Sequence, residues 1–293
     1  MTVRVGPLRS PRGAADAATL PVMIGIDFDE HERSRWAGRA TAYERSFGRL
    51  CAYPAEALLD AAAVGAGRRV IDVGTGPGTV AAAALARGAE VVAVDAEASM
   101  RDAARRNAPG AQVREGVLPH LPFPAGGFDA AVANFVLNHV GDPAAGLAEL
   151  CRVVRPGGRV AVTVWPVPQP PLQRLWGEAV AAAGVAAPAD LPRLAPERDF
   201  PRTEAGLSGL LAAAGLADVR CATLGWAHRT DPESWWAGPA HGVATIGLLL
   251  ERQPAAARER VRQEYDRLSA RYRDTDGNLA LPTAALLASG RVR

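Results

Sequence analysis

The 293-residue sequence contains no lysine, and all 33 of its basic residues are arginine. The chain therefore has no ε-amino group for a Schiff base and no lysine for a Walker phosphate-binding loop. A dehydrogenase site of the Tyr-x-x-x-Lys type is excluded for the same reason. The missing residue type removes Schiff-base enzymes, P-loop phosphotransferases and that class of dehydrogenase from consideration.

Cysteine and histidine are also scarce. Three cysteines, Cys51, Cys151 and Cys221, are widely separated, and five histidines are scattered along the chain. A small, odd number of cysteines is typical of a reducing compartment, so we expect a cytoplasmic protein. Neither residue type shows the close spacing of metal ligands, and we expect no metal site.

Long apolar runs and a strong net charge are missing as well. The chain has no span of about 18 apolar residues, and its formal net charge is only +2. We therefore expect neither a membrane nor a nucleic acid as a partner. Residues 1–22 lack the compact apolar core of a signal peptide, and we expect them to form a disordered tail.

Helical patterns precede the first predicted strand. From Trp36 to Leu50 the apolar residues recur at steps of three and four, which is the spacing of one helix face. Pro54 marks the start of a second helix, and glycines close it near residue 66. We expect residues 23–66 to form two lid helices.

From residue 67 strands and helices alternate. The predicted strands cover 70–74, 90–95, 112–116, 128–135 and 159–165, with further strands near 217–226 and 279–293. Most of these runs are almost entirely apolar, as expected for a parallel sheet covered on both faces. Repeated strand–helix units with short links predict a doubly wound, mostly parallel α/β sheet.

Two segments interrupt this alternation, near residues 166–200 and 228–275. Both are rich in alanine, leucine, proline and tryptophan. We expect them to be helical insertions that roof a substrate site, within one domain that spans residues 67–293.

The turn after the first strand contains three glycines at alternate positions, Gly74, Gly76 and Gly78. A dinucleotide-binding turn has the spacing G-x-G-x-x-G, and here Thr79 stands where the third glycine of that pattern belongs. Asp72 precedes the turn, and its negative charge disfavours a phosphate. The turn therefore favours a ligand that carries an ammonium group.

A second carboxylate, Asp95, ends the second predicted strand. At that position a carboxylate can accept hydrogen bonds from both hydroxyls of a ribose. S-adenosylmethionine combines a ribose with an amino-acid tail, so it satisfies both demands.

With these residues in place, the sequence resembles the class I S-adenosylmethionine-dependent methyltransferases, in particular the small-molecule branch related to ubiquinone and menaquinone methyltransferases. The resemblance covers about a third of the chain, roughly residues 68–165. It rests on the stretches VIDVGTGPG, VVAVDAEASM, LPFPAGGFDAAVANFVLNHV and LAELCRVVRPGGRVAVTVW. It implies a Rossmann-like, seven-stranded sheet whose last strand is antiparallel.

The resemblance also implies roles for individual residues. Asp72 and Gly74 would hold the methionine amino end, Asp95 the ribose, and Asn134 would offer its backbone near the amino group. The remaining implied cofactor contacts are Thr75, Gly76, Gly78, Ala96, Met100 and Phe135.

One segment departs from the family pattern. Relatives often read Gly-Asp-Ala before the LPF segment, and the aspartate accepts a hydrogen bond from the adenine amino group. This chain has Gly116, Val117 and Leu118 there, so adenine would be bound by backbone N–H groups and apolar packing. We expect binding to be retained and weakened by about 1 kcal/mol, the net value of one hydrogen bond.

Four further residues have open interpretations. Tyr43 is either a core aromatic or a lid residue over the sulfonium, whose charge suits an aromatic face; Trp36 is interpreted as packing. His139 is a wall residue of the pocket, a general base or an inert helix residue. His241, in the second insertion, is a further candidate base.

These residues predict methyl transfer to a small, partly apolar metabolite by in-line displacement. Strand 128–135 ends in Asn-Phe-Val-Leu, which differs from the Asn-Pro-Pro-Tyr pattern of enzymes that methylate exocyclic amines. A cofactor-binding protein with a non-methylating reaction, such as a cyclisation, and an NAD(P)-dependent oxidoreductase are the alternatives. Whether oxygen, nitrogen or carbon accepts the methyl group stays open, as does the oligomeric state.

Overall fold

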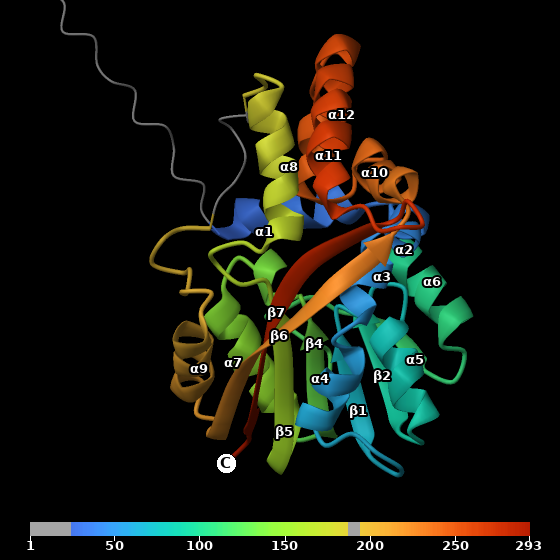
Figure 1. Cartoon of the computed structure of the whole chain (residues 1–293). Helices are drawn as coiled ribbons and strands as arrows, with labels where there is room; N and C mark the ends of the chain where they lie inside the picture. Colours follow the sequence, from blue (N-terminus) through green and yellow to red (C-terminus); the bar gives the residue numbers. More distant parts are fainter. Residues whose placement is uncertain (1–24, 187–193) are drawn as a thin grey trace, which may run out of the picture.

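The structure is a computed structural model that describes residues 25–186 and 194–293. The predicted tail, residues 1–22, and part of the first insertion lie outside these ranges. The chain order of helices and strands is shown in Figure 1.

A seven-stranded sheet forms the centre of the molecule, with the strand order β3-β2-β1-β4-β5-β7-β6. The strands are β1 (Arg69–Val73), β2 (Glu90–Asp95), β3 (Gln112–Glu115), β4 (Phe128–Asn134), β5 (Val154–Val164), β6 (Ala217–Thr230) and β7 (Leu279–Arg291). β7 is antiparallel to both β5 and β6, and the pairings among β1 to β5 are all parallel. The predicted doubly wound sheet with an antiparallel last strand is confirmed.

Helices cover both faces of the sheet. They are α4 (Ala55–Ala61), α5 (Thr79–Ala86) and α6 (Ala98–Asn107), and α7 (Pro143–Val153) and α9 (Glu204–Ala213). Alternate residues of a strand point to opposite faces, so Val70 packs with α4 and α5 while Ile71 packs with α7 and α9. The all-apolar composition of the central strands follows from this double coverage. Asp142 caps α7 by accepting from the Ala145 N–H at 2.8 Å, as its sequence predicts.

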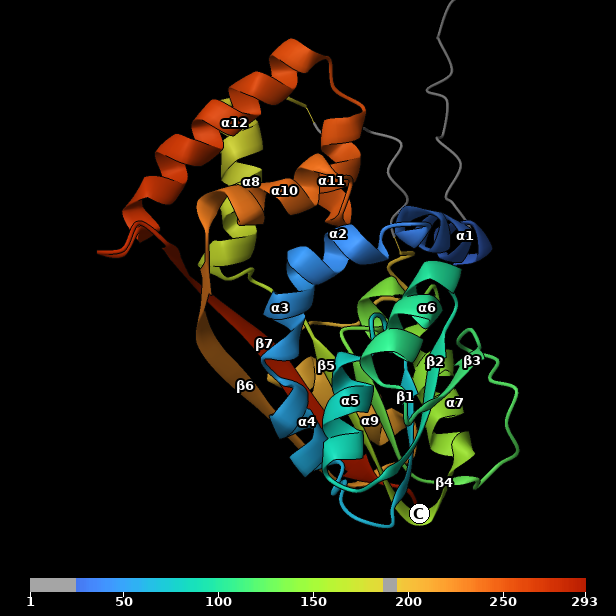
Figure 2. The same ribbon diagram turned by 90° about the vertical axis from the view of Figure 1, so that its right-hand side faces the viewer.

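Four short helices, where two were predicted, precede the sheet. They are α1 (Gly25–Trp36), α2 (Ala40–Arg45), α3 (Phe47–Ala52) and α4. The predicted first helix is divided because Gly38 has a φ of +71° and because Ser46, with φ −125° and ψ −95°, lies outside the helical region. Figure 2 shows α1 to α3 between the sheet and a second group of helices.

That second group is the roof, which we define as α8 (Pro171–Ala182), α10 (Pro232–Ala240), α11 (Ala244–Glu251) and α12 (Ala255–Ser269). It has an aromatic core of its own, in which the rings of Trp176 and Tyr265 stack at 4.9 Å and Trp235 is fully buried. The prediction placed the start of the second insertion too early, since β6 continues to Thr230 and carries His228. The strands β6 and β7 extend beyond the other strands and reach the roof (Figure 1).

No helix in the described ranges is long and apolar enough to cross a membrane.

The packing on β5 predicts the cost of a cavity in the core. Val160 is fully buried, whereas Val167, just beyond the strand, is 53% exposed. Val160→Ala is expected to lower the free energy of unfolding by on the order of 2 kcal/mol, because two buried carbon groups are lost and a void remains. Val167→Ala is the matched control and should change it by less than about 0.5 kcal/mol. Urea denaturation followed by circular dichroism measures both, and equal effects would contradict this packing.

Candidate active site

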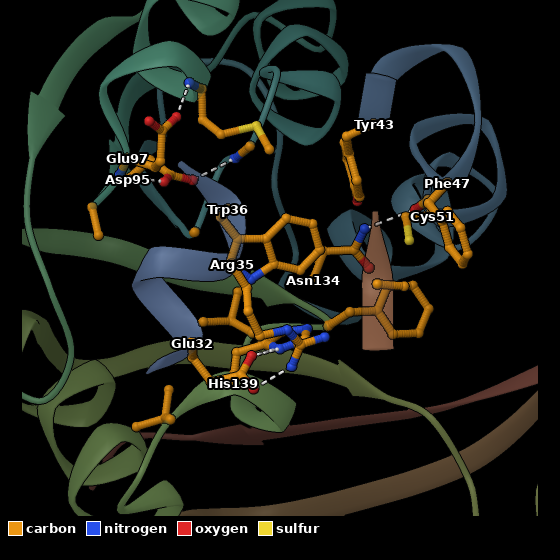
Figure 3. A pocket seen from close by; sticks show the side chains of 18 of the residues that line it. Glu32, Arg35, Trp36, Tyr43, Phe47, Cys51, Asp95, Glu97, Asn134 and His139 are labelled. Carbon is orange, nitrogen blue, oxygen red and sulfur yellow. Dashed lines mark hydrogen bonds and ion pairs between the residues drawn. The ribbon is translucent and has the colours of Figure 1, made fainter. Parts of the chain in front are cut away.

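A cavity of about 540 Å³ lies at the carboxyl edge of the sheet. Its walls come from the ends of β1, β2, β4 and β5, from α1 to α3, and from the roof helices α8 and α11. Open parallel α/β sheets bind their ligands at this edge, because the strand ends and the helix N-termini meet there. Figure 3 shows the side chains that converge on the cavity.

The glycine turn forms one wall of the cavity. Gly74 and Gly76 have φ values of +66° and +53°, and a Cβ atom on Gly74 would lie 2.4 Å from a methyl group of Val136. Both glycines line the cavity. At Gly78, a Cβ atom would lie 3.0 Å from the backbone of Ala104. This third glycine allows α6 to pack closely and does not line the cavity.

Asp72 lies beneath this turn and is 1% exposed. One carboxylate oxygen accepts a hydrogen bond of 2.6 Å from the Thr75 hydroxyl, and the other has no hydrogen-bond partner among the described residues. Burial raises the pKa of Asp72 to about 7, and the charge of Asp95 adds to the effect, against the Thr75 hydrogen bond. A side cavity of about 30 Å³ adjoins Asp72 and Thr75. A cationic group bound beside this carboxylate would favour its ionised form.

Asp95 lines the main cavity at the end of β2. Its carboxylate accepts the N–H of Gly76 at 2.8 Å and the N–H of Glu97 at 2.9 Å. Burial raises the pKa of Asp95, although both backbone hydrogen bonds oppose that rise. An ionised carboxylate has about four lone-pair positions, so two are left for the hydroxyl groups of a ligand.

Next to Asp95 the cavity wall is mainly apolar. Five predicted contacts line this part of it: Ala96, Met100, Gly116, Val117 and Leu118. Gly116 is required sterically, because a Cβ atom would lie 2.6 Å from a methyl group of Val94. Glu97, which the sequence did not suggest, caps α6 through the N–H of Met100 and also accepts the N–H of Gly38. This carboxylate therefore joins the lid to the cofactor side of the cavity.

Asn134 and Phe135 form the floor at the end of β4. The Asn134 side chain donates to the Cys51 carbonyl at 2.8 Å and accepts from the Thr163 hydroxyl at 2.6 Å. Phe135 has a φ of +61°, which is a strained conformation for a bulky residue. Its N–H is bonded to Thr163, and its ring stacks on Trp165 at 3.9 Å. The strained turn thus directs an aromatic pair into the cavity wall.

Tyr43 and Trp36 supply the lid side. Their rings meet edge to face at 5.5 Å, and both line the cavity (Figure 3). Burial, together with the nearby Cys51 thiol, raises the pKa of Tyr43 well above its ordinary value, so the phenol stays neutral. Trp36 was interpreted as packing, but the structure places it in the wall. Its spacing of seven residues from Tyr43 already put both rings on one helical face.

His139 also lines the cavity, on a short 3₁₀ helix (Leu137–His139) that follows β4. Its Nδ1 lies 2.7 Å from a carboxylate oxygen of Glu32, and the other oxygen of Glu32 is bonded by Arg35. Burial alone would raise the pKa of Glu32, but His139 and Arg35 outweigh it and hold the pKa below the ordinary value. No sequence pattern indicated this pair, because the two residues are 107 positions apart.

The second candidate base lies elsewhere. His241 is exposed at the end of α10, where its Nδ1 is bonded to the Ala237 carbonyl, and it does not line the cavity. His241 was a candidate base, but its ring is bonded back onto α10 and lies outside the cavity wall, although Ala244, three residues later, lines that wall. His228 is buried on β6 against Trp235 of the roof, and burial lowers its pKa to about 4.

No group of three or more His, Cys, Asp or Glu side chains in the described part of the chain is arranged to hold a metal ion.

The fold is that of the Rossmann-like methyltransferases. The YcgJ protein of Bacillus subtilis superimposes on 82% of this chain and 98% of its own length, with a TM-score of 0.53 and 21% sequence identity. That likeness shows the fold.

Sequence comparison points the same way. Residues 71–162 match the family model described as a methyltransferase domain. The demethylmenaquinone methyltransferase of Clavibacter sepedonicus is 35% identical over 167 residues, which is 55% of this chain and 65% of that protein. The demethylmenaquinone methyltransferase of Beutenbergia cavernae is 38% identical over 122 residues, which is 41% of this chain and 51% of that protein. The chain thus spans between half and two thirds of these curated relatives, and the predicted resemblance to class I methyltransferases of the menaquinone type is confirmed.

The burial of Asp72 predicts a pH dependence of stability. Its folded-state pKa of about 7 lies above the ordinary value of 3.8, so its contribution to stability is complete below pH 3.8 and is lost as the pH rises through 7. Relative to Asp72→Asn, the ligand-free wild type is expected to lose up to about 4 kcal/mol of unfolding free energy between pH 4 and pH 8. Urea denaturation at several pH values measures this difference. A constant difference between the two proteins would refute the assigned burial of the charge.

Proposed function

We propose that this protein binds S-adenosylmethionine at the glycine turn and transfers its methyl group to a small, partly apolar acceptor in the same cavity. The observation that carries the proposal is that the bare turn and Asp95 line one end of a cavity whose other end is aromatic, while Asp72 lies buried beneath the turn beside the side cavity. The matched methyltransferase domain, residues 71–162, contains all three of these features.

The residues present fit the cofactor. The unpartnered oxygen of Asp72 and the adjoining side cavity suit the ammonium end of the methionine tail. The remaining lone pairs of Asp95 suit the ribose hydroxyls, and the apolar segment from Gly116 to Leu118 suits adenine. Tyr43 and Trp36 present aromatic surfaces, which attract a cation such as a sulfonium.

The acceptor end of the cavity is aromatic and aliphatic with few polar groups. It is lined by Phe47, Leu50, Phe135, Trp165, Leu172, Trp176 and Ile246, with Gln169 and Gln173 among them. Ligand sites of this composition bind largely apolar molecules and orient them with a few hydrogen bonds. The name of the demethylmenaquinone methyltransferase relatives is in keeping with an apolar acceptor.

The bound cofactor supplies an activated methyl group, so the protein mainly provides position and the exclusion of water. α1, α2 and the roof cover the cavity, and the floor residues Asn134 and Phe135 are fixed by hydrogen bonds to Thr163. Holding two reactants in line in this way can lower the barrier by on the order of 7–11 kcal/mol.

The first test of the proposal is Asp95→Asn. Loss of the charged acceptor is expected to weaken binding of S-adenosylhomocysteine about 10- to 100-fold, the range for hydrogen bonds to a charged group. Isothermal titration calorimetry measures this change. Asp102→Asn is the control, because Asp102 is exposed on α6, outside the cavity, and should bind as the wild type does.

Two outcomes would contradict the proposed function. A larger thermal shift with NAD(P) than with S-adenosylhomocysteine would indicate an oxidoreductase. Incubation with methyl-labelled S-adenosylmethionine and cell extract tests transfer itself, and cofactor turnover without label in any product would indicate a non-methylating reaction.

A further inference from the structure

The Glu32–His139 pair places a potential base in the wall of the cavity. Glu32 is on the lid helix α1 and is 7% exposed, whereas the His139 side chain is 33% exposed and lines the cavity. Figure 3 shows the two side chains facing each other below Trp36. Transfer of an already activated methyl group to a neutral amine needs no such base. A base in the cavity wall therefore indicates an acceptor that must lose a proton.

The contacts of Glu32 define the state of the imidazole. Its pKa is held below the ordinary value, so the carboxylate is ionised near neutral pH and can only accept hydrogen bonds. Nδ1 of His139, 2.7 Å away, therefore carries a hydrogen, and in the neutral form of the imidazole the lone pair is on Nε2. Because Nδ1 is occupied, Nε2 is the nitrogen that a ligand can reach.

The ring is also held in place. The rings of Trp36 and His139 meet edge to face with their centroids 5.3 Å apart, and the backbone N–H of His139 is bonded to the Val136 carbonyl at 2.8 Å. The same Trp36 touches Tyr43, which lines both the main cavity and the side cavity at Asp72. One aromatic contact thus links the imidazole to the cofactor side of the site.

We infer that Glu32 positions His139 to remove the proton of a hydroxyl group, and that the acceptor is an apolar molecule with a hydroxyl on an aromatic ring; this rests on the proposed function. In this step the O–H proton passes to Nε2 of His139, and an oxygen lone pair forms the new O–C bond. The C–S bond breaks, and its electron pair stays on sulfur. Glu32 stabilises the imidazolium that results.

The single imidazole in the cavity wall favours oxygen over the other acceptors. Methylation of a ring carbon requires a C–H proton to be removed in addition to the step at the hydroxyl. A neutral amine attacks with its own lone pair. Transfer to oxygen requires one proton to move to one base, and proton transfer by such a base contributes about 10²- to 10⁴-fold to rate.

The test has a spectroscopic arm that needs no acceptor. In ¹⁵N-histidine NMR spectra of the S-adenosylhomocysteine complex, neutral His139 is expected as the Nδ1–H tautomer. Glu32→Gln should change this to a mixture of tautomers, because an amide can also donate. Glu32→Asp should partly restore the Nδ1–H form. Glu30→Gln is the control, since Glu30 is exposed on the same helix and does not line the cavity. A dominant Nε2–H tautomer in the wild type would overturn the positioning role.

The kinetic arm uses 2-naphthol and 2-naphthylamine as matched probes with methyl-labelled cofactor. We expect an O-methyl product from 2-naphthol, at least about tenfold more than any product from the amine. His139→Gln should lower kcat for 2-naphthol about 100-fold, and Glu32→Gln about tenfold, with the KM for S-adenosylmethionine unchanged.

Three results would overturn the acceptor class: equal transfer to the amine, methylation at carbon, or no transfer to either probe by a protein that binds S-adenosylhomocysteine. After any of these three results the proposed function stands if the protein still transfers label from the cofactor to a component of the extract. Failure to bind S-adenosylhomocysteine would instead remove the proposed function itself.

Discussion

The hydrogen bond from the Gly76 N–H to the Asp95 carboxylate joins two segments that are 19 residues apart. It fixes the turn after β1 against the end of β2, and both strands pair in parallel, so their carboxyl ends meet at one edge. Asn134 ends β4 on the other side of β1. The lid and the roof are arranged around this edge, and Gly74 and Gly76 bring bare backbone into the wall of the cavity between them.

The same edge concentrates negative charge. Asp72 is buried and Asp95 is half-buried, and each carries a raised pKa, chiefly because of desolvation. Such a pair is costly without a partner, since a buried carboxylate prefers to be neutral. A zwitterionic ligand with an ammonium group near Asp72 and hydroxyls near Asp95 would offset that cost. The same two carboxylates therefore select the ligand and are stabilised by it.

The sequence was sufficient for features that depend on local pattern. The all-apolar runs located the central strands, and the glycine spacing with Asp72 located the ligand edge. It failed where distant segments meet. The pairing of Glu32 with His139, across 107 residues, depends on where α1 packs, and the position of His241 depends on its hydrogen bond back to Ala237 of α10. The predicted lid helices divided into shorter ones because single residues, Gly38 and Ser46, leave the helical conformation.

The central claim is that this edge recognises the amino-acid tail together with the nucleoside. Calorimetric titration of the protein with S-adenosylhomocysteine and with adenosine tests it most directly. Because the ammonium group would meet the carboxylate of Asp72, S-adenosylhomocysteine is expected to bind at least about tenfold more tightly than adenosine, the effect of one charge-assisted hydrogen bond. Equal affinities for the two ligands would contradict the account.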